Sequence, residues 1–88
     1  MNSTQQRFFQ QLARIQEACV QRALACPGRE EDRLCQVSYE MAAGILELID
    51  GYSPFSSDRH DLVNTLTGER LKERPFLELH DHLEEFLR

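Results

Sequence analysis

The chain has 88 residues, of which 41% are hydrophobic, and carries a formal net charge of −5 at pH 7. This length suits one small domain over residues 1–88, and the apolar share is sufficient for a hydrophobic core. The acidic balance argues against direct nucleic-acid binding, which needs clustered lysine and arginine, and no apolar run approaches the roughly 18 residues of a membrane span.

The first 20 residues and the cysteines indicate a compartment. The N-terminal sequence is polar from its second residue and lacks an apolar signal core, so we expect no secretory signal and a cytoplasmic location. Cys19, Cys26 and Cys35 are an odd number of cysteines, and thiols stay reduced in the cytosol. We therefore expect no disulfide support. Lys72 is the only lysine, and every other residue among the lysines and arginines is an arginine.

The first predicted helix runs from about Ser3 to Ala25. Ser3 and Gln6 have the spacing of a capping box, and Cys26-Pro27-Gly28 ends the helix, because proline disfavours helix at the preceding residue. Apolar side chains recur every three or four residues, as in an amphipathic helix. They are Phe8, Leu12, Ile15, Cys19, Ala23 and Cys26.

The second predicted helix runs from about Arg29 to Asp50, and Gly51 is its expected C-terminal cap. Its apolar stripe consists of Leu34, Val37, Met41, Ile45 and Leu48. We place Glu40, Glu47 and Asp50 on the solvated face. The short break between the two helices predicts an antiparallel helical hairpin.

Residues 58–71 allow two interpretations. A glycine at position 68 between β-tolerant residues favours a small β-hairpin, and the alternative is a helical turn from Asp58 to Leu66 capped by Gly68. A lone hairpin is marginal in water, so it would have to lie against the helices.

A shorter C-terminal helix is predicted within residues 74–88, beginning either near Pro75 or near Asp81. The predicted fold class is therefore mainly α, with a two-helix hairpin, a C-terminal helix and a small hairpin or turn between them. The expected core contains Phe8, Leu12, Ile15, Cys19, Leu34, Val37, Met41, Ile45, Leu48, Leu79 and Leu83.

His80 and His82 are weak candidates for metal ligands. Histidines two residues apart do not share a helix face, and the cysteines lack the paired spacing of zinc sites. We therefore expect no metal, no cofactor and no catalytic residue, and we expect His80 to be a packed histidine with a backbone partner.

Two features are candidates for an interaction surface. Ala42, Ala43 and Gly44 interrupt the second helix with small residues, which permit close packing within the chain or form a seam for a second chain. Tyr52 and Phe55 follow that helix, and they are either interface anchors or a lid over the helix ends.

Three hypotheses for the function follow. The leading one is a small cytoplasmic interaction or regulatory module that presents an apolar helical face to a protein partner, a second copy of itself included, as in a homodimer. The second is a metal- or thiol-dependent enzyme that uses His80, His82 and a cysteine. The third is an acidic mimic that binds a basic protein surface.

Overall fold

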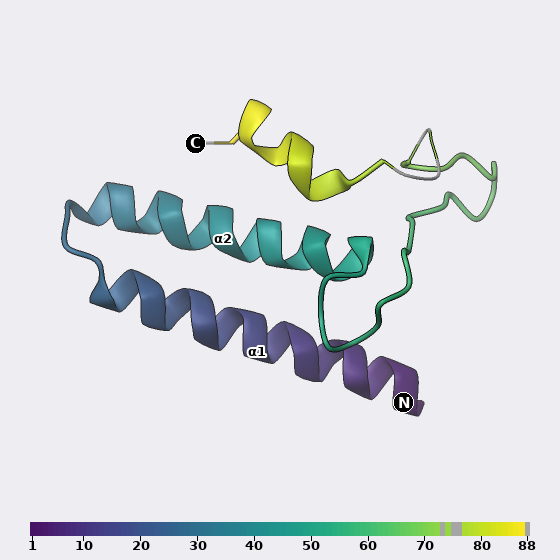
Figure 1. Ribbon diagram of the computed structural model, residues 1–88, viewed down its shortest axis with the longest axis horizontal. Helices are drawn as coiled ribbons and strands as arrows, with labels where there is room; N and C mark the ends of the chain where they lie inside the picture. The colour runs from purple at the N-terminus through teal and green to yellow at the C-terminus, as the bar shows by residue number, and fades with distance from the viewer. Residues whose placement is uncertain (73, 75–76, 88) are drawn as a thin grey trace.

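The computed structural model describes residues 1–72, 74 and 77–87. Two long helices, α1 (Ser3–Ala25) and α2 (Glu30–Asp50), precede a short 3-10 helix, η1 (Leu79–Glu85). Figure 1 shows α1 and α2 running antiparallel, with η1 along the opposite side of α2. The prediction of a mainly α fold is confirmed, and no strand occurs in the described part of the chain.

A capping box begins α1, one residue earlier than predicted. The Asn2 side chain accepts a hydrogen bond from the Gln5 amide at 2.8 Å, and the Asn2 amide donates to Gln5 Oε1 at 2.9 Å. Asparagine is as good an N-cap as serine, and Asn2 with Gln5 has the same spacing as Ser3 with Gln6, so the sequence offers both registers and the helix uses the earlier one.

Gly51 ends α2 in the left-handed conformation, with a φ of +95°. The amide of Tyr52 donates to the Glu47 carbonyl at 2.9 Å, which closes the last turn. A Cβ atom at Gly51 would lie 2.9 Å from the carbonyl oxygens of Ser57 and Asp58. Glycine is therefore required both by the backbone angle and by the loop that returns across the end of α2.

The seam between α1 and α2 is tight at Gly44. A Cβ atom there would lie 2.7 Å from Cγ2 of Ile15, closer than real atoms pack. An ion pair between Arg22 and Glu40, 3.0 Å long, joins the same two helices. Contacts within the chain thus account for the glycine in the middle of α2.

The segment after Gly51 folds back over the open end of the helical pair. The ring of Phe55 packs edge-on against Phe8, with ring centres 5.6 Å apart, and the Arg7 guanidinium lies over it. Arg7 also donates a hydrogen bond to the Phe55 carbonyl. Phe55 therefore behaves as the lid that was one of its two predicted roles.

The hairpin predicted for residues 58–71 is reduced to a single antiparallel bridge between Val63 and Arg70. The amide of Asn64 donates to the Glu69 carbonyl at 2.8 Å, and the amide of Leu71 donates to the Leu62 carbonyl at 2.9 Å. The backbone follows the hairpin path without forming a strand, so the alternative helical turn from residue 58 to 66 is wrong.

The C-terminal helix begins at Leu79, later than the earlier of its two predicted starts. Pro75, the residue proposed for that start, lies outside the described residues. The side chain of Asp50 accepts a hydrogen bond from the His80 amide at 3.0 Å. A carboxylate from α2 thus caps the first turn of η1 and fixes where it begins.

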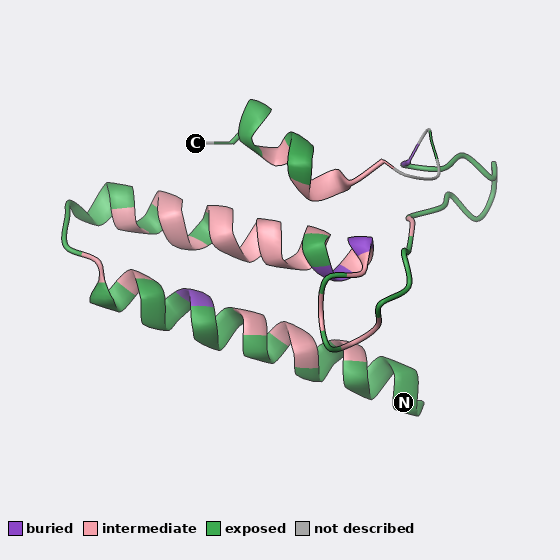
Figure 2. Cartoon of the chain, in the orientation of Figure 1, coloured by how far each residue is buried: buried purple, intermediate pink, exposed green. Residues whose placement is uncertain are grey.

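The hydrophobic core is small. Among the described residues the buried apolar side chains are Cys19 and Leu48, each 1% exposed, and Figure 2 shows green exposed positions along most of α1 and pink half-buried positions along most of α2. Cys19 and Leu48 were both predicted in the core, and their burial confirms this. Leu34, also predicted there, is 60% exposed, and the remaining predicted core residues are half-buried. The reason is that α1 and η1 contact α2 from different sides and do not contact each other.

Candidate functional site

A buried ionic cluster lies where α2 ends. Lys72 Nζ is 2.7 Å from Asp50 Oδ1, and His80 Nδ1 is 2.7 Å from Asp50 Oδ2. Asp50 is 2% exposed and Lys72 is 6% exposed. Within the described residues, neither Asp50 Oδ1 nor Lys72 Nζ has another hydrogen-bond partner, so these two charges depend on each other.

Local geometry brings the three groups together. Asp50 is the last residue of α2, and the loop then turns at Gly51. Asp61 accepts hydrogen bonds from the Lys72 amide at 3.0 Å and from Arg70 Nε at 3.1 Å. Asp61 therefore holds the returning segment of the 62–71 loop in the position that points Lys72 at Asp50.

The cluster perturbs the pKa of Asp50 and that of His80. Burial opposes the charge of Asp50, but the hydrogen bonds from Lys72 and His80 outweigh it and lower the pKa of Asp50 to about 2. Burial likewise opposes the charge of His80, but the hydrogen bond to Asp50 and the charge of Asp81 raise its pKa above the ordinary value. The arrangement thus stabilises a carboxylate with a cation on each side.

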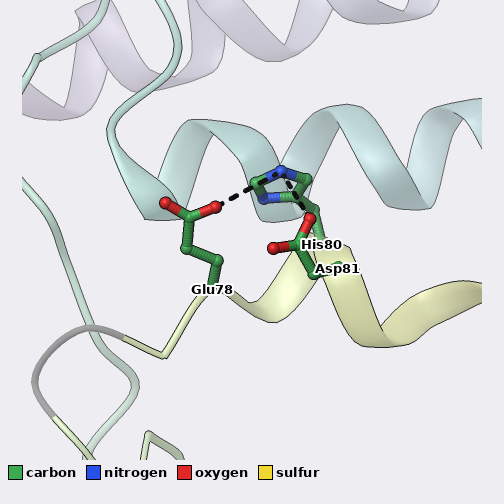
Figure 3. A group of neighbouring side chains, drawn as sticks. All are labelled: Glu78, His80 and Asp81. Atoms are coloured by element: carbon green, nitrogen blue, oxygen red, sulfur yellow. Dashed lines mark ion pairs between the residues drawn. The ribbon is translucent and has the colours of Figure 1, made fainter.

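The other ring nitrogen of His80 faces two further carboxylates. Nε2 lies 3.3 Å from Asp81 Oδ1 and 3.8 Å from Glu78 Oε2, and Figure 3 shows both side chains turned toward the ring. One ligand atom from each of the three residues lies within 4.8 Å of the others. Tyr52 donates a hydrogen bond to Glu78 Oε1, which raises the pKa of the Tyr52 hydroxyl, and its ring packs edge-on against His80.

Of the two histidines predicted as weak metal candidates, the structure places only His80 in this cluster. His82 lies 3.7 Å from Glu85 instead, on an exposed part of η1. The cluster of His80 with Glu78 and Asp81 contains no cysteine. Cys35 lies 15 residues before Asp50 on the same helix, which is about 22 Å at 1.5 Å per residue. The structure therefore does not bring the histidines and that thiol to one place.

Sequence reasoning missed Asp50 and Lys72. Asp50 was placed on the solvated face, which is wrong, and His80 has a carboxylate partner in place of the expected backbone one. A signal was present, because an acidic side chain in the last turn of a helix opposes the helix dipole and calls for a cation. The only lysine of the chain is that cation.

A second candidate site is an apolar face shared by the two long helices. At 100° per residue, Leu34, Met41 and Ile45 fall within about 40° of one another on α2, and Phe9 and Val20 fall within about 20° on α1. Val20, Ala23, Leu24, Leu34 and Val37 line one shallow groove between the helices together with the charged Glu30 and Arg33, so both helices contribute to the same side. We call this surface the apolar face; its exposed members are Phe9, Val20, Leu24 and Leu34.

The five predicted interface residues occupy different places. Gly44 lies in the α1–α2 seam, and Ala43 lines a groove on the polar side together with Tyr52. Tyr52 is 57% exposed, whereas Ala42 and Phe55 are half-buried. None of the five belongs to the exposed apolar face.

The shape of the chain is open for its mass. It exposes 6710 Å², whereas a folded monomer of 10.3 kDa is expected to expose about 5,400 Å². Its radius of gyration is 14.8 Å, against about 12 Å for a compact chain of this length. No described helix is both long enough and apolar enough to cross a membrane.

Comparison with known proteins adds no relative to this description: no family model, no curated protein and no solved structure matches the chain.

Proposed function

We propose that this protein is a small cytoplasmic interaction module that self-associates by placing its apolar face against that of a second copy. The observation that carries the proposal is the surplus of about 1,300 Å² of exposed surface over that of a compact monomer. Each partner at a standard protein interface buries about 800 Å². The surplus is therefore large enough for one interface of ordinary size.

The chemistry of the apolar face favours a second copy. Its exposed members, Phe9, Val20, Leu24 and Leu34, are apolar. The groove that three of them line also contains one acidic and one basic side chain, Glu30 and Arg33, so its charges do not call for a partner of one sign. Two-fold symmetry places the same patch on both sides of an interface, so an apolar patch that carries one charge of each sign suits a second copy of itself.

Self-association also completes the architecture. Helical domains bury their apolar stripes by packing elements in two layers. Here α1, α2 and η1 form one row, and the apolar side of that row stays exposed. A second helical hairpin laid on this side supplies the missing layer as a four-helix arrangement.

The buried ionic cluster supports this function indirectly. Asp50 joins the end of α2 to the loop through Lys72 and to η1 through His80. These bonds hold η1 on the far side of α2 from α1. The apolar face therefore stays uncovered, and the orientation of α2 relative to η1 is fixed.

Charge insertion into the apolar face tests the proposal by sedimentation velocity. Leu24→Glu and Leu34→Glu alter side chains that are 64% and 60% exposed, so the fold of each chain is expected to survive. Each is expected to weaken the dimer by about 30-fold or more, the loss of one interface anchor. Leu66→Glu is the matched control, because Leu66 is 95% exposed on the loop outside the face.

The proposal fails if Leu24→Glu and Leu34→Glu sediment as the unaltered protein does over the whole concentration range. It also fails if the control Leu66→Glu dissociates the dimer to the same extent, since the effect would then not belong to the apolar face.

A further inference from the structure

We propose that Glu78, His80 and Asp81 form a binding site for one divalent transition-metal ion, with Zn²⁺ as the best fit. The three ligand atoms are His80 Nε2, Asp81 Oδ1 and Glu78 Oε2 (Figure 3). This site is separate from the apolar face and does not depend on the proposed self-association.

The spacing of these atoms suits a metal ion. Zinc binds histidine nitrogen and carboxylate oxygen at about 2.0–2.2 Å, so neighbouring ligand atoms in a tetrahedral site lie about 3.4 Å apart. The nitrogen of His80 is 3.3 Å from the Asp81 oxygen and 3.8 Å from the Glu78 oxygen. Small side-chain movements bring all three atoms to bonding distance of one ion.

Asp50 prepares His80 for this role. Its buried carboxylate accepts a hydrogen bond from Nδ1 at 2.7 Å, which assigns the ring proton of a neutral His80 to that nitrogen. The lone pair is then on Nε2, on the side of the ring that faces Glu78 and Asp81. A carboxylate bound to the second nitrogen is the usual outer partner of a metal-ligating histidine.

Glu78 has an outer partner as well. Tyr52 donates a hydrogen bond to Glu78 Oε1, and Arg59 Nη2 lies 3.5 Å from the same oxygen. Both partners are on Oε1, and Oε2 is the oxygen nearer to His80. Two of the three ligands are thus oriented by contacts outside the site, which distinguishes it from a chance meeting of surface acids.

The donor set decides which metal fits. One imidazole and two carboxylates are the mixture that first-row transition metals accept, whereas Ca²⁺ takes 6–8 oxygen ligands. Asp81 is 65% exposed at the side chain, so an ion can enter from solvent and water can complete the coordination.

Zinc titration of the chain, followed by nuclear magnetic resonance of the histidine ring nitrogens, tests the site. We expect one Zn²⁺ per chain and a large shift of His80 Nε2, with the ring signals of His60 and His82 little changed. Millimolar Mg²⁺ or Ca²⁺ in place of Zn²⁺ is expected to leave the His80 signal where it was. The ring-nitrogen signal separates this site from zinc bound by the three free cysteines.

Two variants remove ligands, and two serve for comparison. Asp81→Asn changes an exposed side chain and is expected to weaken zinc binding on the order of 100-fold, and Glu78→Gln is expected to do the same. Tyr52→Phe removes only an outer partner and is expected to weaken binding about 10-fold. The matched control is Glu85→Gln, which alters an acid of the same helix that pairs with His82.

The inference is overturned if zinc leaves His80 Nε2 unshifted, or if Asp81→Asn binds zinc as tightly as Glu85→Gln does. Circular dichroism in the presence of a chelator shows whether each variant is folded. Asp81→Asn alone decides the question should Glu78→Gln fail to fold. The zinc-binding results are independent of the oligomeric state of the chain, because that state is measured without metal.

Discussion

Asp50 and Lys72 form a buried ion pair between the last residue of α2 and a loop residue 22 positions later, with Oδ1 and Nζ 2.7 Å apart. The same carboxylate binds His80 through its other oxygen. One aspartate thereby joins α2, the loop that carries Lys72, and η1. Because the buried apolar side chains among the described residues are Cys19 and Leu48, we expect this junction to help hold the loop and η1 against α2.

Replacing Lys72 by methionine is expected to destabilise the protein by about 3 kcal/mol, the lower end of the range for breaking a buried pair. The carboxylate of Asp50 would lose the partner of Oδ1 while remaining buried, and His80 would compensate only through Oδ2. Urea unfolding followed by circular dichroism measures the loss, with the metal removed by a chelator.

The double variant Asp50→Asn with Lys72→Met is the control for that prediction. Removing both charges leaves no unpaired ion, so the double variant is expected to be more stable than Lys72→Met alone. A loss of unfolding free energy below about 1 kcal/mol for Lys72→Met would contradict the claim that the buried pair of Asp50 and Lys72 stabilises the fold.

Acid is expected to unfold the protein through Asp50. Its pKa is lowered from 3.8 to about 2, so its contribution is complete above pH 3.8 and is lost as the pH falls toward 2. The lost stability amounts to about 2 kcal/mol, from 1.36 kcal/mol per pKa unit. Unfolding free energies measured between pH 5 and 2 check this, and Asp50→Asn is expected to flatten the profile.

Alkaline conditions act through His80 with the opposite sign. Its pKa is raised above 6.5, so its contribution is complete below pH 6.5 and is lost as the pH rises through the raised value. We expect metal-free protein to be most stable between about pH 4 and 6.5. A stability that keeps rising above pH 7 would contradict the assignment of this pair.

Periodicity predicted the two long helices and their antiparallel pairing, because α1 and α2 carry apolar stripes and clear end signals at Cys26-Pro27-Gly28 and Gly51. It could not predict the burial of Asp50, since helical position alone assigns an acid beside Glu47 to solvent. The partner, Lys72, is far along the chain and is placed by the path of an irregular loop. Long-range polar pairs of this kind leave no periodic trace.

The exposure of Leu34 was missed for a related reason. An apolar stripe on a helix predicts that some element covers those side chains, but it does not identify that element. Here η1 lies on another side of α2 and does not cover Leu34. The start of η1 was equally hidden, because the cap of its first turn is the side chain of Asp50 from α2.

Gly44→Ala is expected to destabilise the protein by about 1 kcal/mol, although alanine is the better helix former by a similar amount. The new Cβ would lie 2.7 Å from Cγ2 of Ile15, a β-branched side chain with little rotamer freedom in a helix, and overpacking costs about 1–3 kcal/mol. Chemical unfolding of Gly44→Ala, of Ile15→Ala and of the double variant measures the coupling. Additive losses would mean that the two residues do not clash.

Thermal stability is expected to depend on protein concentration. Association of folded chains stabilises them by mass action, so Tm rises as the concentration rises. Leu34→Glu is expected to remove this dependence, because Leu34 is an exposed member of the apolar face. The control Leu66→Glu is expected to keep it. Scanning calorimetry over a hundredfold concentration range makes the comparison, and a Tm of the unaltered protein that does not move would argue against association.

We expect the apolar face to be covered by a second copy of the chain. Light scattering coupled to size-exclusion chromatography measures the mass directly, in a chelating buffer so that metal plays no part. We predict a species of twice the 10.3 kDa chain mass that dissociates on dilution. A strict 10.3 kDa monomer up to millimolar concentration would contradict it.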